Sequence, residues 1–233
     1  MQRRSRWARL LRAVALACLS VAAASVAVVA LFRFVPVPVT AFMIRDRLGD
    51  AAGSVPQRHD WVPWEEISRH AAVAVIAAED QRFLQHDGFD FEAIDRALAE
   101  AGRGRRLRGA STISQQAAKN LFLWPGQSWP RKALEVWFTV WIELLWPKQR
   151  ILEVYLNSAE FGPGTWGVEA ASRRYFGKPA LRLERHEAAL LAAVLPSPKR
   201  YRAGNPGPFV QQRQQWILRQ MEQMHRAGLL EGL

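Results

Sequence analysis

Residues 13–32 contain no charged side chain, and nearly all of them are apolar. About 20 such residues span the hydrocarbon core of a bilayer as a helix. Arginines precede the run, and the first acidic residue is Asp46. Because basic residues favour the cytoplasmic side, we predict a cytoplasmic segment at residues 1–12, a transmembrane signal-anchor at residues 13–34, and an exported remainder.

A cleaved signal peptide is the alternative interpretation of this run. Ala22-Ala23-Ala24-Ser25 offers the small residues that are typical of a cleavage site. The apolar run continues beyond them and is longer than a usual signal core, which favours an uncleaved anchor. The only cysteine, Cys18, lies inside the run. The exported part therefore has no disulfide, and its fold must depend on an apolar core.

The charge of the chain is unevenly distributed. The formal net charge is +11, and residues 1–34 contribute six arginines and no acid, which leaves +5 for the remainder. A moderately basic domain beside a membrane suits anionic headgroups or phosphate-bearing ligands, and nucleic acid is a poor partner for an exported domain. With 49% apolar and 23% charged residues, the composition is that of a globular protein.

The segments after the anchor show helical periodicity. They contain no alternation of apolar and polar residues long enough to indicate a β-strand, so we predict an all-α fold. We expect a linker and membrane-proximal segment at residues 35–63 and one domain at residues 64–233. Helices are predicted at residues 40–48, from Pro63 through Ala78, around Phe91, Ile94 and Leu98, from Thr112 to Trp124, and at residues 131–146, 148–158, 165–176, 184–195 and 208–227. Residues 102–109, with three glycines and four arginines, predict a mobile loop suited to gathering an anionic substrate.

Glu79 and Asp80 directly follow the apolar run of residues 73–78. We expect the helix that carries them to stop at the turn that Gly88 can supply. A carboxylate in an apolar helix end is costly to ionise, so its pKa should be raised into the range where it exchanges protons. The alternative is that both carboxylates are solvated residues at a helix end.

Five ordered segments, spread over roughly residues 65–200, resemble the motifs of the peptidoglycan glycosyltransferases, glycosyltransferase family 51. They are Glu79-Asp80-x-x-Phe83-x-x-His86-x-Gly88-x-Asp90, Gly109-Ala110-Ser111-Thr112-Ile113-x-Gln115-Gln116-x-x-Lys119-Asn120, Arg131-Lys132-x-x-Glu135, Lys148-x-x-Ile151-Leu152-Glu153-x-Tyr155-Leu156-Asn157, and Glu187-Ala188-Ala189-Leu190-Leu191-Ala192 running into Leu195-Pro196. No Ser-x-x-Lys or Lys-Thr-Gly sequence of the penicillin-binding transpeptidase module occurs, so the resemblance is to the monofunctional members.

The resemblance implies a lysozyme-like helical lobe with a small membrane-facing lobe, held at the bacterial inner (plasma) membrane. It also implies the reaction, in which a growing glycan on undecaprenyl pyrophosphate is transferred to the 4-hydroxyl of lipid II, with inversion. Such a transfer needs a base for the acceptor and charge stabilisation for the departing pyrophosphate. Other proteins of cell-wall synthesis or division are candidate partners.

Two carboxylates take catalytic roles in this interpretation. Glu79 is the candidate general base, and Glu135 is the second carboxylate, which assists on the leaving-group side. The spacing of Glu135 also fits an intrahelical pair with Arg131. His86 is expected to form structural hydrogen bonds, since a lone imidazole has no nucleophile to serve. Glu153 and Asn157 are expected to support the fold.

The remaining candidate residues bind substrate. Lys119, Arg131 and Lys132 are the pyrophosphate candidates. The candidates for sugar hydroxyl and acetamido groups are Gln115, Gln116, Ser111 and Thr112, although Gln115, Ser111 and Thr112 also suit a helix cap. The absence of a His/Cys cluster argues against zinc, whereas a divalent ion such as Mg²⁺, shared between a carboxylate and the pyrophosphate, is chemically plausible.

Two other function classes fit parts of the sequence. A lysozyme-like hydrolase would also use a glutamate in a helical lobe, but it has no need of cations for a pyrophosphate. A catalytically silent membrane scaffold would need neither Glu79 nor Glu135.

Overall fold

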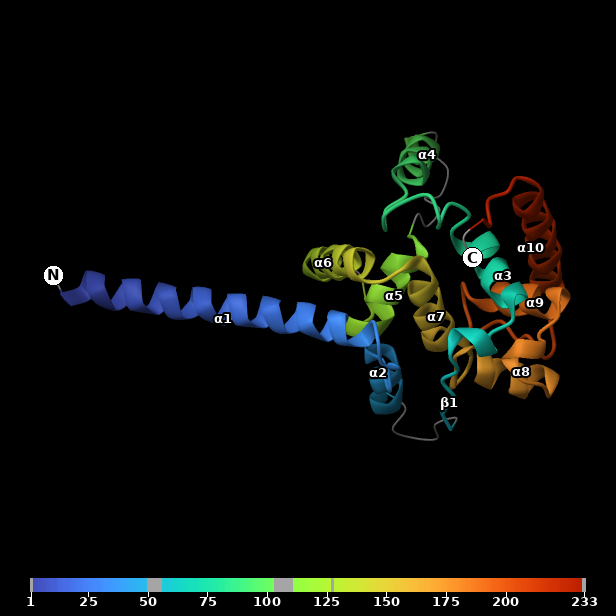
Figure 1. Ribbon diagram of the computed structural model, residues 1–233, viewed down its shortest axis with the longest axis horizontal. Coiled ribbons are helices and arrows are strands. Elements are labelled where there is room, and N and C mark those ends of the chain that lie inside the picture. The colour runs from blue at the N-terminus through green and yellow to red at the C-terminus, as the bar shows by residue number, and fades with distance from the viewer. Residues whose placement is uncertain (1, 50–55, 103–110, 127, 232–233) are drawn as a thin grey trace.

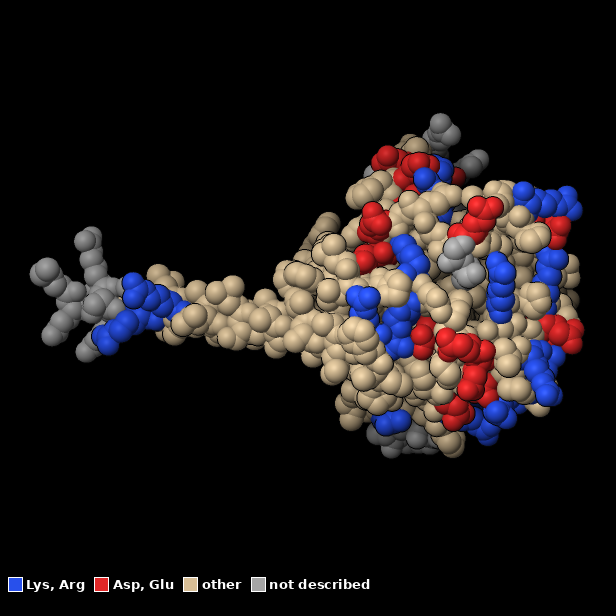
Figure 2. Space-filling view, viewed as in Figure 1, with Lys and Arg blue, Asp and Glu red and all other residues tan. Residues whose placement is uncertain are grey.

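A computed structural model of the chain describes residues 2–49, 56–102, 111–126 and 128–231. Helix α1 (Gln2–Phe32) projects from the rest of the molecule as one long rod (Figure 1). Its stretch Arg9–Phe32 is the one described helix that is long and apolar enough to cross a membrane. At about 1.5 Å per residue it exceeds the thickness of a bilayer core. The described part of the predicted basic segment forms the first turns of this same helix, and Figure 2 shows blue basic residues near the start of the rod and only tan residues along the stretch that follows.

The last turns of α1 are bound to the domain by hydrogen bonds. Arg150 donates to the carbonyl of Phe32 from Nε at 3.1 Å and from Nη2 at 2.8 Å. The indole of Trp146 donates to the carbonyl of Val29 at 2.8 Å. Arg33 in turn donates to the carbonyl of Leu145 at 2.7 Å. These contacts hold the end of α1 against α6 (Trp129–Leu145) and α7 (Lys148–Ser158).

The rest of the chain is mainly helical, as the sequence predicts. α3 (Arg69–Glu79) is the central helix, and α9 (Arg185–Val194) and α10 (Pro208–Arg226) pack along it (Figure 1). α5 (Ile113–Phe122) packs between α6 and α7. The other helical elements are α2 (Ala41–Gly49), α4 (Phe91–Gly102), α8 (Val168–Phe176) and two 3₁₀ turns at Trp64–Glu66 and Ala180–Arg182.

A small sheet adds to this helical frame. β1 (Arg58–His59) pairs parallel with β3 (Thr165–Trp166), and β3 pairs antiparallel with β2 (Glu160–Gly162). Strands of two or three residues are too short to show alternation in the sequence. The helix predicted for residues 165–176 therefore starts at Val168. Gly167 precedes it with a φ of 85°, and a Cβ there would come within 2.8 Å of the Asn157 carbonyl oxygen.

Helix α3 differs from the prediction at both ends. The segment that begins at Trp64 forms a 3₁₀ turn, and α3 starts only after Ser68, whose Oγ accepts a hydrogen bond from the His70 N–H at 3.2 Å. The prediction that the helix runs on to Gly88 is wrong, because α3 ends at Glu79. Asp80 leaves helical geometry with φ −160° and ψ 76°. Glu79 therefore stands at the true end of the buried helix.

Helix α6 carries an exposed apolar surface. Its exposed large apolar residues are Trp129, Leu134, Val136, Trp137, Val140 and Leu144. Contiguous apolar exposure of this kind marks an interaction surface in a globular protein. Trp137 Nε1 donates to Ser25 Oγ at 3.1 Å, so this surface lies next to the apolar part of α1.

Candidate active site

Glu79 ends α3 and lies against α5 and α10. Its Oε2 accepts a hydrogen bond from Nε2 of Gln116 at 3.1 Å, and its Oε1 accepts one from Nη2 of Arg213 at 3.2 Å. The Glu79 side chain is 16% exposed. The carboxylate is therefore neither free nor solvated, but is fixed by one neutral and one cationic donor.

The pKa of Glu79 is raised above its ordinary value. The main cause is burial, which penalises the ionised form. The hydrogen bond from Gln116 and the charges of Arg213 and Lys119 act in the opposite direction and stabilise the ionised form. This net direction is the one expected for a carboxylate at an apolar helix end. A base of this kind is stronger than an exposed glutamate.

Gln116 is itself held by a buried residue of α7. The hydroxyl of Tyr155 donates to Gln116 Oε1 at 3.1 Å, and the Tyr155 side chain is 1% exposed. Burial is the first cause that raises the pKa of this phenol, and the charges of Glu79 and Asp80 add to it, so the hydroxyl keeps its proton and serves as a donor. With Oε1 occupied in this way, the amide nitrogen of Gln116 faces Glu79.

Arg213 and Tyr155 were not predicted to be site residues, although Tyr155 stands in the fourth motif. Arg213 lies on α10, outside the five motifs. A signal for it exists nevertheless, because Val210, Ile217 and Met221 are buried on one face of α10. Arg213 is spaced three residues after Val210 and four before Ile217, which places it on that same face. Arginine is rare on an apolar helix face, so its presence there indicates that its side chain has a specific interaction partner.

The second candidate carboxylate, Glu135, is buried on α6, with 3% of its surface exposed. Its Oε2 accepts a hydrogen bond from Nη1 of Arg131 at 2.8 Å, and its Oε1 pairs with Nζ of Lys132. The intrahelical pair with Arg131 is therefore formed. Both carboxylate oxygens accept from cations, so Glu135 also fixes the two pyrophosphate candidates of its own helix.

Lys119 stands apart from these pairs. Within the described part of the chain, its contact is a cation–π approach of Nζ to the Phe42 ring at 5.8 Å, with no ion pair. The pKa of Lys119 is lowered, first by burial, and Arg131 and Lys132 add to the effect. The charges of Glu135 and Glu79 oppose it. An unpaired, half-buried ammonium group is suited to an anionic ligand.

Two cavities meet beside these side chains. One, of about 930 Å³, is lined by Glu79 and by the α10 residues Phe209, Gln212, Arg213, Trp216 and Arg219. The other, of about 400 Å³, is lined by Phe42, Lys119, Arg131, Lys132 and Glu135. Ser111 and Gln116 line both cavities. The structure therefore places the candidate base in one cavity and the candidate pyrophosphate cations in the adjoining one.

Thr112 and Gln115 differ from Gln116, because they hydrogen-bond to each other and Gln116 binds Glu79. Gln115 N–H donates to Thr112 Oγ1 at 3.2 Å, and Thr112 N–H donates to Gln115 Oε1 at 3.0 Å. This reciprocal pair is a capping box at the start of α5. The hydroxyl of Thr112 also donates to the Gly88 carbonyl at 2.7 Å. Both side chains are buried, and these hydrogen bonds fix the helix that carries Gln116 and Lys119.

Comparison with known proteins agrees with this geometry. A family model described as Transglycosylase matches residues 47–222. The chain belongs to the transglycosylase family. A protein of Aeromonas hydrophila named "Biosynthetic peptidoglycan transglycosylase" is 53% identical over 221 residues, which cover 95% of this chain and 94% of that protein. A protein of the same name from Pseudomonas aeruginosa is 55% identical over 204 residues, covering 87% and 88%. The family predicted from the sequence motifs is confirmed.

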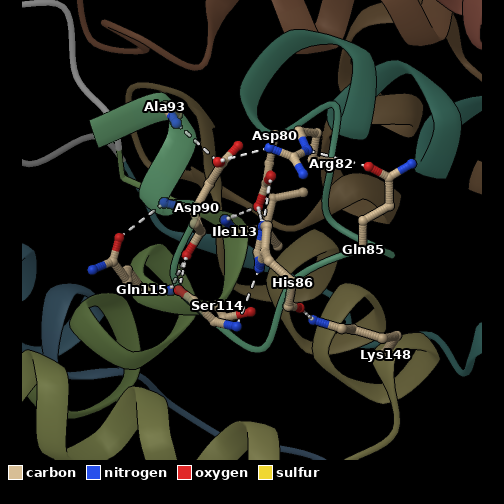
Figure 3. A network of polar contacts seen from close by, with 12 residues as sticks. Asp80, Arg82, Gln85, His86, Asp90, Ala93, Ile113, Ser114, Gln115 and Lys148 are labelled. Carbon is tan, nitrogen blue, oxygen red and sulfur yellow. Dashed lines mark hydrogen bonds and ion pairs between the residues drawn. The ribbon is translucent and has the colours of Figure 1, made fainter. Parts of the chain in front are cut away.

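In this transglycosylase the first motif also builds a polar network beneath the site (Figure 3). Asp80 Oδ2 accepts from the Ile113 N–H at 3.0 Å, and Asp80 Oδ1 lies 2.9 Å from Nε2 of His86. The Gly88 N–H donates to Nδ1 of His86 at 3.1 Å, so Nε2 carries the imidazole proton. Asp80 therefore fastens the end of α3 to the start of α5. His86 makes the structural hydrogen bonds expected of it.

The fourth motif of the transglycosylase lies on α7 and also supports the fold. Asn157 accepts from the Val62 N–H and donates to the Val62 carbonyl, both at 2.9 Å. Glu153 pairs with Arg150 at 2.7 Å. Both residues have the supporting role predicted for them. The arginine-rich segment predicted to be a mobile loop falls mainly on residues 103–110, which lie outside the described residues.

The transglycosylase site does not fit a divalent metal ion at Glu135. Both oxygens of this carboxylate already accept from Arg131 and Lys132. Lys119 adds a third positive charge to the same cavity, so a further dication there would be repelled. In the described ranges, no group of three or more His, Cys, Asp or Glu side chains is arranged to hold a metal.

Proposed function

We propose that this transglycosylase polymerises lipid II into glycan strands for the cell wall. The donor is a growing glycan on undecaprenyl pyrophosphate, and the acceptor is the 4-hydroxyl of a lipid II sugar. The transfer inverts the donor carbon and releases undecaprenyl pyrophosphate. The observation that carries the proposal is the pair of adjoining cavities, one with the buried Glu79 carboxylate and the other with the Lys119, Arg131 and Lys132 cations.

Glu79 acts as the general base in this proposal. Burial raises its pKa, which strengthens it as a proton acceptor, while the donors Gln116 and Arg213 keep the ionised form accessible. The acceptor hydroxyl gives its proton to Glu79 as its oxygen attacks the anomeric carbon of the donor. The bond between that carbon and the pyrophosphate oxygen breaks on the opposite face, as inversion requires.

Positive charge stabilises the departing pyrophosphate. Arg131 and Lys132 are held by Glu135, and Lys119 faces the same cavity without an ion pair among the described residues. Pyrophosphate is a good leaving group, so cations replace a strong general acid. Glu135 contributes by setting the position of the two cations beside it, which supports its proposed role on the leaving-group side.

Ser111 and Gln116 contact the sugars in this scheme, because they line both cavities. Thr112 and Gln115 are proposed to act on substrate indirectly. Their hydrogen bonds fix the start of α5, and this helix carries Gln116 and Lys119. The large apolar residues of α10, Phe209 and Trp216, also line the cavity that holds Glu79. Aromatic side chains of this kind pack against the apolar faces of sugar rings.

We also propose that the anchor holds this site at the inner membrane. We propose that residues 1–12 are cytoplasmic, that residues 13–34 span the bilayer, and that residues 35–63 lead to a periplasmic domain at residues 64–233. The exposed apolar surface of α6 next to α1 supports a membrane-facing lobe. A site beside the bilayer can accept a lipid-linked donor and acceptor without removing either lipid from the membrane.

Polymerisation of lipid II by the purified full-length chain tests the proposal. Wild-type protein should form glycan strands, and Glu79→Gln should reduce the rate by about 100-fold or more. Glu66→Gln, at an exposed glutamate of the preceding 3₁₀ turn, is the matched control and should keep wild-type activity. Failure of the wild type to polymerise, or full activity of Glu79→Gln, would refute the proposal. Release of soluble fragments from cell-wall sacculi would favour a hydrolase instead.

A further inference from the structure

Arg213 joins α10 to the end of α3. One nitrogen of its guanidinium, Nη2, donates to Oε1 of Glu79 at 3.2 Å and to the carbonyl of Ala78 at 3.4 Å. The carbonyls at a helix C-terminus carry partial negative charge, which disfavours a carboxylate at that position. A single cation therefore compensates both the helix terminus and the Glu79 carboxylate.

We infer that Arg213 is a positioning residue for the transferase reaction, which holds the Glu79 carboxylate in the orientation that receives the acceptor proton. The inference rests on the proposed role of Glu79 as the base. Gln116 fixes one carboxylate oxygen from α5, and Arg213 fixes the other from α10. Each oxygen has two lone pairs, so each keeps one for a hydroxyl proton.

The arginine can do this because its own position is fixed. Val210 and Ile217, one turn to either side of Arg213, are buried in the core. α10 packs against both α3 and α9. The Arg213 side chain is 23% exposed and lines the cavity that holds Glu79. Two donors on two rigid helices hold a carboxylate more accurately than one donor on a loop.

The charged groups around Glu79 predict how Arg213 affects the reaction. Arg213 approaches from α10 and Lys119 from α5, while Arg219 lines the same cavity and Tyr155 faces Glu79 through Gln116 from α7. Asp80, the next residue, is turned toward α5. Burial raises the pKa of Glu79, and Arg213 opposes that rise. Removing Arg213 therefore raises the pKa of Glu79 further, so the base becomes protonated at a higher pH.

The pH dependence of kcat/KM for lipid II polymerisation tests the inference, with full-length Arg213→Met and Arg213→Lys compared with wild type. A base acts only when ionised, so its pKa sets the acid limb of the profile. In Arg213→Met the limb should move to higher pH, and kcat at its optimum should fall by about 10- to 100-fold with a smaller change in KM. Arg213→Lys keeps the charge, so its acid limb should stay near that of wild type while kcat remains reduced.

Controls separate this inference from a loss of structure and from failure of the proposed function. Arg226→Gln removes an arginine from α10 that pairs with Glu222 and is 75% exposed, and its profile should match wild type. An acid limb that is unshifted in Arg213→Met, or equally shifted in Arg213→Lys, would overturn the inference. Glu79→Gln is measured alongside: an active Glu79→Gln refutes the base itself, whereas an inactive Glu79→Gln with a normal Arg213→Met refutes only the role of Arg213.

Discussion

Tyr155 and Gln116 are joined by a hydrogen bond of 3.1 Å between the phenolic hydroxyl and the amide oxygen. Because this oxygen is occupied, the amide nitrogen of Gln116 is the group that faces Glu79, at 3.1 Å. A carboxylate accepts a hydrogen bond from an amide N–H and is repelled by an amide oxygen. A residue on α7 therefore determines which end of the Gln116 amide meets the candidate base on α3.

Tyr155→Phe removes that hydroxyl without changing the ring. Gln116 can then turn its amide, and the hydrogen bond that lowers the pKa of Glu79 weakens. We expect kcat/KM for lipid II to fall by about three- to tenfold, the scale of one neutral hydrogen bond. The acid limb of the pH profile should move to higher pH, because the pKa of Glu79 rises when this donor is lost.

Tyr175→Phe is the control for this experiment, because Tyr175 lies on α8 and lines neither of the two cavities. Its pH profile should match that of wild type. An unchanged acid limb in Tyr155→Phe would show that the orientation of Gln116 does not depend on this hydroxyl.

The two glutamates of α6, Glu135 and Glu143, should behave differently when neutralised. Glu135 holds Arg131 and Lys132 beside the candidate pyrophosphate cavity, whereas Glu143 pairs with Lys148 at 2.9 Å and with the Ser114 hydroxyl. We expect Glu135→Gln to reduce kcat/KM by about 100-fold, the scale of losing one preorganised electrostatic contact. Glu143→Gln should lower the melting temperature and keep turnover per folded molecule within about twofold.

Polymerisation assays and thermal melting of both α6 variants, in the same detergent, separate these effects. Equal losses of activity after correction for the folded fraction would mean that Glu135 only stabilises its helix, as the spacing of Arg131 and Glu135 alone would suggest.

The sequence predicted those features that depend on local chemistry. The apolar run, the periodicity of the helices and the placement of Glu79 after buried residues are all visible in the order of the residues. The early end of α3 is not visible in the order of the residues, because it depends on a contact between elements. The carboxylate of Asp80 accepts a hydrogen bond from the Ile113 N–H, 33 positions further along the chain. Local patterns favour continuing the helix, and that tertiary hydrogen bond outweighs them.

The same distinction between local features and contacts of distant residues applies to the candidate site. The candidate catalytic carboxylates and cations stand in motifs, so their identity was accessible from the sequence. The contact between Arg213 and Glu79 spans 134 positions, and no spacing rule relates the two. The β-strands were missed for a similar reason, since β1 pairs with a strand far along the chain and each strand is too short to show alternation.

Asp80 should contribute mainly to stability. Its carboxylate accepts from the Ile113 N–H and from His86, and its side chain is 3% exposed. Asp80→Ala would leave both donors buried without this partner, which should cost about 2–3 kcal/mol and lower the melting temperature by about 5–10 °C. Asp87→Ala is the matched control, because Asp87 is exposed in the same turn. A melting temperature equal to that of Asp87→Ala would show that Asp80 does not fasten α3 to α5.

The apolar surface of α6 should enter the bilayer beside α1. Trp137 on α6 contacts Ser25, which lies seven residues before the end of α1, or about 10 Å along the helix axis. If α1 spans the membrane, this part of α6 must reach a similar depth. Leu144 is 69% exposed on α6, whereas Leu181 is 54% exposed on the 3₁₀ turn at Ala180–Arg182, so the two leucines form a matched pair.

Each leucine can be replaced by cysteine in a Cys18→Ser background and labelled with an environment-sensitive fluorophore. In liposomes, lipids with brominated acyl chains should quench the label at position 144 strongly and leave the label at position 181 unaffected. The reason is that an apolar side chain at bilayer depth contacts acyl chains, whereas an exposed leucine elsewhere on the domain contacts water. Equal quenching at the two positions, or none at position 144, would place α6 outside the membrane and restrict the lipid contact of the domain to α1.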